Sequence, residues 1–82
     1  MILRRWNYEK HIYEPYQASE NAATYMEDLD SFVDCAECGK KIRFGCSYTS
    51  LRIHTPIFGM GYAVCEECYK KEWEERRKYC YD

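Results

Sequence analysis

The sequence of 82 residues lacks any apolar run that approaches the length of a membrane span, and its first residues lack the apolar segment of a secretory signal. A membrane helix needs about 20 consecutive, mostly apolar residues, and a signal needs a shorter apolar core behind its basic start. We therefore expect a cytoplasmic protein that makes no contact with a membrane. In such a reducing compartment, paired cysteines bind metal more often than they form disulfides.

A charge excess of one sign is also missing, because 12 Lys and Arg face 14 Asp and Glu, which gives a net charge of −2. Nucleic-acid-binding domains are typically strongly basic, so the composition disfavours that function and leaves only a local basic patch open. The charge is unevenly spread. Residues 1–34 have four more acidic than basic groups, whereas residues 35–64 have three more basic than acidic groups. This asymmetry suggests that the two segments dock on each other.

Aliphatic side chains are few, whereas aromatic residues make up 17% of the chain and include nine tyrosines. The length favours a single domain, and a chain this short often needs a metal or disulfides to supplement a modest core. The apolar content of 46% is nevertheless too high for a wholly disordered chain. Aromatic rings must therefore supply much of the buried area.

Two C-x2-C pairs, Cys35 with Cys38 and Cys65 with Cys68, are separated by 26 residues. Two cysteines three positions apart on a tight turn can aim both sulfurs at one ion, and Zn²⁺ prefers four such ligands in a tetrahedron with bonds of about 2.3 Å. Gly39 lets the backbone turn after the first pair. The pattern predicts one structural Zn²⁺. An iron–sulfur cluster, disulfides or a redox-active pair on the same cysteines are the alternatives.

The same four cysteines argue against catalysis. A catalytic zinc keeps one coordination position open, and four cysteines close it. The sequence also lacks a recognisable pair of nucleophile and base. We therefore expect no enzyme activity and no small-molecule substrate.

The segment between the two pairs has the pattern of a hairpin. Residues 47–54 alternate, which places Ser50, Arg52 and His54 on one face and Leu51 and Ile53 on the other. Turn residues follow at 56–61, and residues 61–64 read as a second strand.

After Cys65 the chain contains strong helix formers and neither Gly nor Pro, so it predicts a helix with acidic residues at its start and basic residues near its end. We expect Tyr69 and Trp73 to pack in the core against Leu51, Ile53 and Val64. Three acidic residues of the helix are expected to face solvent: Glu72, Glu74 and Glu75.

Residues 1–19 show no clear period, and Pro15 interrupts any helix there, so we assign residues 1–31 to an N-terminal extension. We expect an irregular, aromatic and acidic N-terminal extension that packs on the following domain. Residues 20–30 could form a short helical turn.

The knuckle CAECGK, the hairpin at residues 42–64 and the second pair that opens the helix, VCEECYKKEW, together resemble a treble-clef zinc finger. LIM and GATA-type fingers share this arrangement. The resemblance covers about residues 33–79 and implies a small α+β zinc-binding domain over residues 32–82. The chain has ligands for one site where a LIM domain has two, and its linker is longer than that of a GATA-type finger. The whole chain is also similar to short zinc proteins of Gram-positive bacteria and their phages or mobile elements, which implies no particular activity.

Two functions remain open at the level of sequence. The first is a protein-interaction module, such as a small adaptor or inhibitor, because the charge balance is acidic and aromatic residues abound. The second is nucleic-acid binding, in which basic residues contact phosphates and aromatic rings stack on bases. The residues proposed for these contacts are Lys40, Lys41, Arg43 and Arg52, with Tyr48 and Phe58 as stacking platforms.

Two cysteines are left outside the pairs, Cys46 and Cys80. They could form a second metal or redox site, with His54 or His11 as a further ligand. Ordinary half-buried thiols are the simpler interpretation. The sequence leaves both open.

Overall fold

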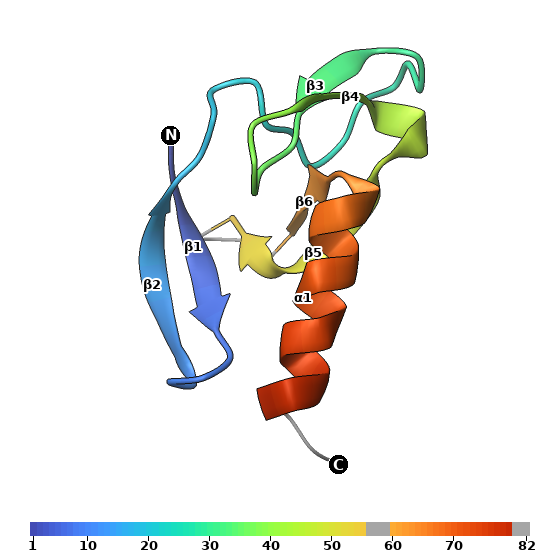
Figure 1. Cartoon of the computed structure of the whole chain (residues 1–82). Helices are drawn as coiled ribbons and strands as arrows, with labels where there is room; N and C mark the ends of the chain where they lie inside the picture. Colours follow the sequence, from blue (N-terminus) through green and yellow to red (C-terminus); the bar gives the residue numbers. More distant parts are fainter. Residues whose placement is uncertain (56–59, 80–82) are drawn as a thin grey trace.

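The computed structural model describes residues 1–55 and 60–79, which form two β-sheets and one long helix (Figure 1). The larger sheet has the strand order β2-β1-β5-β6, and the smaller one pairs β3 with β4. No helix among the described residues is long and apolar enough to cross a membrane. The elements are β1 (Ile2–Asn7), β2 (Ile12–Gln17), β3 (Phe32–Asp34), β4 (Lys41–Arg43), the 3-10 helix η1 (Phe44–Cys46), β5 (Tyr48–His54), β6 (Gly61–Val64) and α1 (Glu66–Tyr79).

The N-terminal segment differs from the expected irregular extension. Strands β1 and β2 form an antiparallel hairpin in which six residues of each strand pair, and β1 also pairs with β5 through Arg5 and Ile53. His11 closes the hairpin turn with a φ of 57°. Pro15 is accommodated because β2 is an edge strand, where one side of the backbone needs no hydrogen-bond partner. Residues 2–17 are therefore part of the main sheet.

Residues 20–30 form turns and bends, not the expected helical turn. One turn is closed by the Ser31 amide, which donates to the Asp28 carbonyl at 3.0 Å. Acidic residues cluster at the end of this segment, where they would oppose a helix macrodipole, so a helix gains little here.

The structure confirms the predicted hairpin and the helix that follows Cys65. Within β5, however, the pairing with β6 shifts between Thr49 and His54. The shift interrupts the strict alternation of side chains. As a result Arg52 and Ile53 are both buried, whereas Leu51 is 37% exposed and not a core residue.

Three of the four paired cysteines belong to the hydrophobic core. Cys35, Cys65 and Cys68 lie in one buried cluster with Ile53 and Val64. The core therefore sits where β5, β6, the start of α1 and the CAECGK turn meet. In this small protein the candidate metal site and the apolar core are a single unit.

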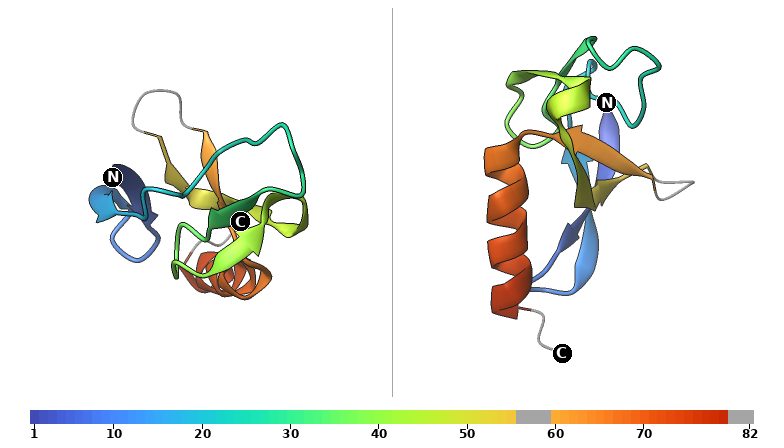
Figure 2. Two further views of the ribbon diagram at one scale, coloured as in Figure 1. Left: turned by 90° about the horizontal axis from the view of Figure 1, so that it is seen from above. Right: turned by 90° about the vertical axis from the view of Figure 1, so that its right-hand side faces the viewer.

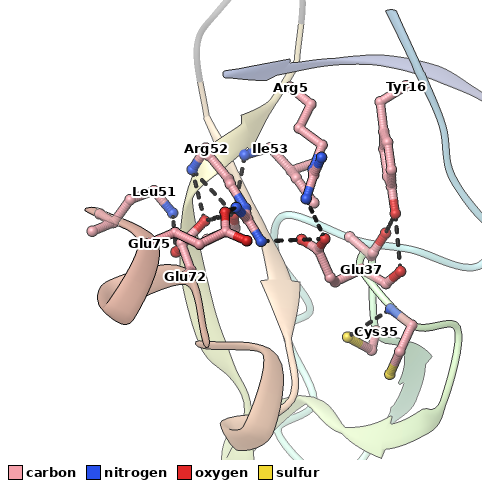
Figure 3. Close-up of polar contacts among 12 residues, drawn as sticks. Arg5, Tyr16, Cys35, Glu37, Leu51, Arg52, Ile53, Glu72 and Glu75 are labelled. Atoms are coloured by element: carbon pink, nitrogen blue, oxygen red, sulfur yellow. Dashed lines mark hydrogen bonds and ion pairs between the residues drawn. The ribbon is translucent and has the colours of Figure 1, made fainter. Parts of the chain in front are cut away.

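Glu72 is buried, contrary to the expectation that it faces solvent, and its side chain is only 2% exposed. Its carboxylate accepts hydrogen bonds from the amides of Leu51 at 2.9 Å and Arg52 at 3.0 Å, and from the Ser50 hydroxyl at 2.7 Å (Figure 3). These amides lie in the stretch of β5 where the pairing with β6 is irregular. Glu72 thus accepts hydrogen bonds from two strand amides, and the Ser50 hydroxyl oxygen also accepts one from the Arg52 amide at 3.2 Å.

We predict that Glu72→Gln lowers the free energy of unfolding by about 2–3 kcal/mol, because the amide lacks the charge that faces buried Arg52 and turns a donor toward backbone amides. Urea unfolding of the metal-loaded protein measures the change. Glu74→Gln is the matched control, since Glu74 is exposed on the same helix and its loss should change the stability by less than about 0.5 kcal/mol. Equal unfolding midpoints for the two variants would contradict this assignment.

Candidate metal centre

The structure brings the four predicted ligands together, although 26 residues separate the two pairs. Cys35 and Cys38 lie on the turn between β3 and β4, Cys65 joins β6 to α1, and Cys68 lies in the first turn of α1. All four sulfur atoms lie within 4.8 Å of one another, and those of Cys38 and Cys65 are 3.8 Å apart. A tetrahedron with Zn–S bonds of 2.3 Å has edges of about 3.8 Å. The cluster therefore has the dimensions that one such ion needs.

The turn that carries the first pair is held by its own backbone. The Gly39 amide donates to the Cys35 carbonyl at 2.9 Å, and the Cys35 amide donates to the Lys40 carbonyl at 2.7 Å. Gly39 has a φ of 79°, a left-handed conformation that glycine adopts at little cost. This confirms the expected turning role of Gly39. The turn directs the sulfur atoms of Cys35 and Cys38 toward the same candidate metal position.

Backbone amides also surround the Cys35 sulfur, which accepts hydrogen bonds from the amides of Cys38 at 3.5 Å and Cys65 at 3.3 Å. Burial raises the pKa of the Cys35 thiol, but these donors outweigh it and hold that pKa below its ordinary value. The pKa of Cys68 is raised, first by burial and then by bonds to the neighbouring cysteines.

The pKa of Cys35 is lowered and that of Cys68 is raised, so the four sulfurs are not equally easy to deprotonate. Four thiolates this close repel one another, and burial adds to the cost of their charge. A divalent cation at their centre would offset both, because thiolates bind metal in the deprotonated form. Soft sulfur ligands in a tetrahedral arrangement favour zinc or an iron–sulfur cluster among the biological metals. The four cysteines thus fit the predicted zinc ion.

An ion-pair network ties the first pair to the rest of the fold, and its centre is Glu37 (Figure 3). Its carboxylate accepts a hydrogen bond from Arg5 of β1 at 2.7 Å and lies 3.3 Å from the guanidinium of Arg52 in β5. The hydroxyl of Tyr16 donates to the carbonyls of Ala36 and Glu37 at 2.8 and 3.0 Å. The N-terminal hairpin therefore helps to position the metal-binding turn.

Sequence reasoning missed the part played by Glu37. A signal was present, because Glu37 is the single acidic residue among residues 35–64 and lies inside the first cysteine pair. A lone carboxylate in a basic segment, next to cysteines that must be fixed in space, is a reasonable candidate for a buried ion pair.

The proposed phosphate contacts are separated by the structure. Lys40, Lys41 and Arg43 are exposed on the turn and on β4. Arg52 is 4% exposed and forms ion pairs with Glu37, Glu72 and Glu75. Its predicted role in nucleic-acid contact is therefore wrong, because its guanidinium is enclosed by the protein's own carboxylates.

The aromatic and charge-based expectations have mixed outcomes. Tyr48 is exposed and stacks on Tyr69 of α1 at a ring distance of 4.8 Å. Phe58 lies outside the described residues. The expected docking of acidic on basic segments has one example here, the 4.0 Å ion pair between Asp30 and Arg43.

The leftover cysteines and histidines do not join a second cluster among the residues that the structure describes. Cys46 is exposed on η1, and Cys80 lies outside the described part of the chain. His54 packs near the ring of Tyr13, and burial together with the charge of Arg4 lowers its pKa. His11 lies in the β1–β2 turn beside Trp6.

Comparison of the chain with protein-family models, with curated proteins and with solved structures found no match.

We predict one zinc per chain in native protein, measured by elemental analysis, with no iron and no visible absorption from a cluster. Cys35→Ser should lose most of the zinc, because serine is a poor ligand for this ion and Cys35 is the most enclosed of the four. Cys46→Ser and Cys80→Ser should each keep one zinc. Loss of zinc in either control, or stoichiometric iron, would contradict the four-cysteine assignment.

Proposed function

We propose that this chain is a treble-clef zinc-binding domain with a structural zinc ion, and that it acts as a protein-interaction module. The order of elements supports the treble clef: a CAECGK turn, the β5–β6 hairpin, and a second cysteine pair at the start of α1. The N-terminal β1–β2 hairpin is an addition to that arrangement and extends its sheet.

The burial of the cluster supports a structural role for the zinc. Cys35, Cys65 and Cys68 are each 7% exposed or less, and four sulfurs would complete a tetrahedron. Such a site leaves no position for a substrate, so we propose no enzymatic activity. Structural zinc sites in finger peptides contribute about 10–16 kcal/mol at neutral pH, which exceeds the total stability of many small domains.

We predict that removal of the metal unfolds the domain. Exhaustive chelation should abolish the helical circular dichroism signal and the dispersed amide resonances, and added Zn²⁺ should restore both. The reason is that the cysteines form part of the core, and without a cation their buried thiolates would repel one another. A native spectrum in protein shown by elemental analysis to be free of metal would refute the structural role.

The observation that carries the interaction role is a group of exposed apolar side chains between β2 and β4. Tyr25, Leu29 and Phe32 are 66%, 60% and 59% exposed. Leu29 is joined to η1 by the Gly45 amide, which donates to its carbonyl at 2.8 Å. The three side chains lie within eight positions of one another in the sequence, and large apolar side chains that neighbouring residues leave exposed are candidates for contact with other proteins. We call Tyr25, Leu29 and Phe32 the partner surface.

The charge around the partner surface favours protein over nucleic acid. Glu27, Asp28 and Asp30 are all exposed within this segment, and their charges would repel a phosphate backbone. Arg43 pairs with Asp30 and lies 5.8 Å from the ring of Phe32. Nucleic-acid binding through Lys40, Lys41 and Arg43 is the alternative function. Arg52 is not available for such contacts, because it is buried and paired with carboxylates.

We predict that immobilised protein captures a protein partner through the partner surface. The double variant Leu29→Ser/Phe32→Ser should lose that partner, whereas Lys40→Ala/Lys41→Ala should retain it. We also expect no gel shift with single- or double-stranded nucleic acid at low salt. A salt-dependent shift that Lys40→Ala/Lys41→Ala abolishes would instead establish the nucleic-acid alternative, because phosphate contacts release counterions.

A further inference from the structure

An aromatic groove runs along α1 beside Tyr48, the first residue of β5. Figure 2 shows α1 at one side of the molecule, with one flank toward β5 and another turned away from the rest of the chain. The groove has a volume of about 440 Å³, and its floor is made by Tyr48, Tyr69 and Trp73. Tyr48 and Tyr69 stack at 4.8 Å, and the ring of Trp73 stands at 76° to that of Tyr69.

Four charged residues of α1 line this groove, and their signs alternate along the helix. Glu66, Lys70, Glu74 and Arg77 follow one another at intervals of three or four residues, which places them on one stripe. Glu66 and Lys70 are largely exposed and pair with each other at 3.2 Å. The stripe therefore reads negative, positive, negative, positive from the start of α1 to its end.

A stripe with this order of charges is complementary to itself in one direction only. A second copy laid on it in parallel and in register would place like charges opposite each other. An antiparallel copy places Glu66 opposite Arg77 of the second copy, and Lys70 close to Glu74 of the second copy. The same direction also opposes the two helix macrodipoles favourably, since acidic starts meet basic ends.

We propose that the aromatic groove binds the aromatic groove of a second copy of this chain, with the two α1 helices antiparallel about a two-fold axis. The aromatic rings would form the centre of this interface, and four ion pairs would form its rim. Two-fold dimers are built from one patch that meets itself, and this patch fulfils that condition in both its shape and its charge. This inference goes beyond the proposed function and uses a surface that does not include Tyr25, Leu29 or Phe32.

The balance of charge in the groove makes other occupants less suitable. Two acidic and two basic groups surround the aromatic floor. A nucleic acid would require an excess of basic groups, and a strongly basic peptide would require an excess of acidic groups. A partner with the same alternating charges, such as a second copy, matches the groove without leaving a charge unpaired.

The dimer should be weak and reversible. The lined stripe runs from Glu66 to Arg77, about 16 Å of helix at 1.5 Å per residue. One such face is smaller than the roughly 800 Å² per partner of a standard stable interface, so we expect a dissociation constant on the order of 1–100 μM. Association should therefore depend on protein concentration.

Sedimentation of the zinc-loaded full chain over a range of concentrations tests the proposal. The single variants Glu66→Arg and Arg77→Glu should each weaken dimerisation by about tenfold, because two pairs per dimer turn from attraction into repulsion. The double variant Glu66→Arg/Arg77→Glu should restore it to nearly the wild-type level. Residues 66 and 77 lie about 16 Å apart in one helix, so they cannot pair within a chain and restoration requires a second copy.

The matched control is Glu67→Arg/Arg77→Glu, which has the same net charge as the double variant. Glu67 is exposed in the same turn but does not line the groove, so this control should stay as weak as Arg77→Glu. Trp73→Ala should also abolish dimerisation. Zinc content and helical circular dichroism of every variant identify any that fail to fold. Among the folded variants, recovery of dimerisation in Glu66→Arg/Arg77→Glu is the result that tests the antiparallel pairing.

Three results would overturn the proposal. The first is a wild-type protein that remains monomeric at all concentrations. The second is a dimer that neither single charge reversal weakens, because it would use another face. The third is weakening by both single variants without recovery in the double variant, which would exclude the antiparallel pairing. Loss of the partner captured through Leu29 and Phe32 is a separate measurement, so the two proposals can fail independently.

Discussion

The close approach of four cysteine sulfurs, all within 4.8 Å of one another, is the constraint on which the fold depends. It fixes the point where the β3–β4 turn, the end of β6 and the start of α1 meet. In a chain with few aliphatic residues, this meeting point also lies in the core, where Cys35, Cys65 and Cys68 are packed with Ile53 and Val64. A metal ion held there would join segments that have too little apolar surface to hold each other.

The charged network around Arg52 extends that constraint to the outer elements. A buried guanidinium is costly unless it is paired, and Arg52 meets carboxylates from the metal-binding turn and from α1. Glu37 also accepts a hydrogen bond from Arg5, which links β1 to the same network. Each partner comes from a different element, so the network is complete only when all of them are in place. We expect such a network to favour this one arrangement of the strands and the helix over others, more than to raise the free energy of unfolding.

The sequence predicts those features that depend on local spacing. The two C-x2-C pairs, the turn at Gly39 and the helix after Cys65 all follow from residues within a few positions of one another. The sequence did not predict the β1–β2 hairpin, because its place in the sheet depends on the distant pairing of Arg5 with Ile53. In addition, a proline such as Pro15 argues against a strand unless that strand lies at the edge of a sheet. The burial of Arg52 and Glu72 was missed for a related reason. A shift of pairing inside β5 interrupts the expected alternation, so that Arg52 and Ile53 are both buried, and no local pattern in residues 48–54 signals it.

The helix α1 buries a charged side chain and leaves two large aromatic rings only partly buried. Its inner flank buries Cys68 and the charged Glu72. Tyr69 packs partly against the core, as expected, and also lines an open groove together with half-buried Trp73. The inner flank is explained by the cysteine cluster, to which Cys68 contributes a sulfur, and by the amides of β5, which donate to the Glu72 carboxylate. Two large rings in the groove contribute less to the core than they would if fully buried, since their stabilising effect scales with the apolar area removed from water. The residues on the surface of α1 are therefore better explained by the proposed contact with a second copy than by a contribution to the stability of the fold. The alternating charges favour an antiparallel arrangement of the two helices.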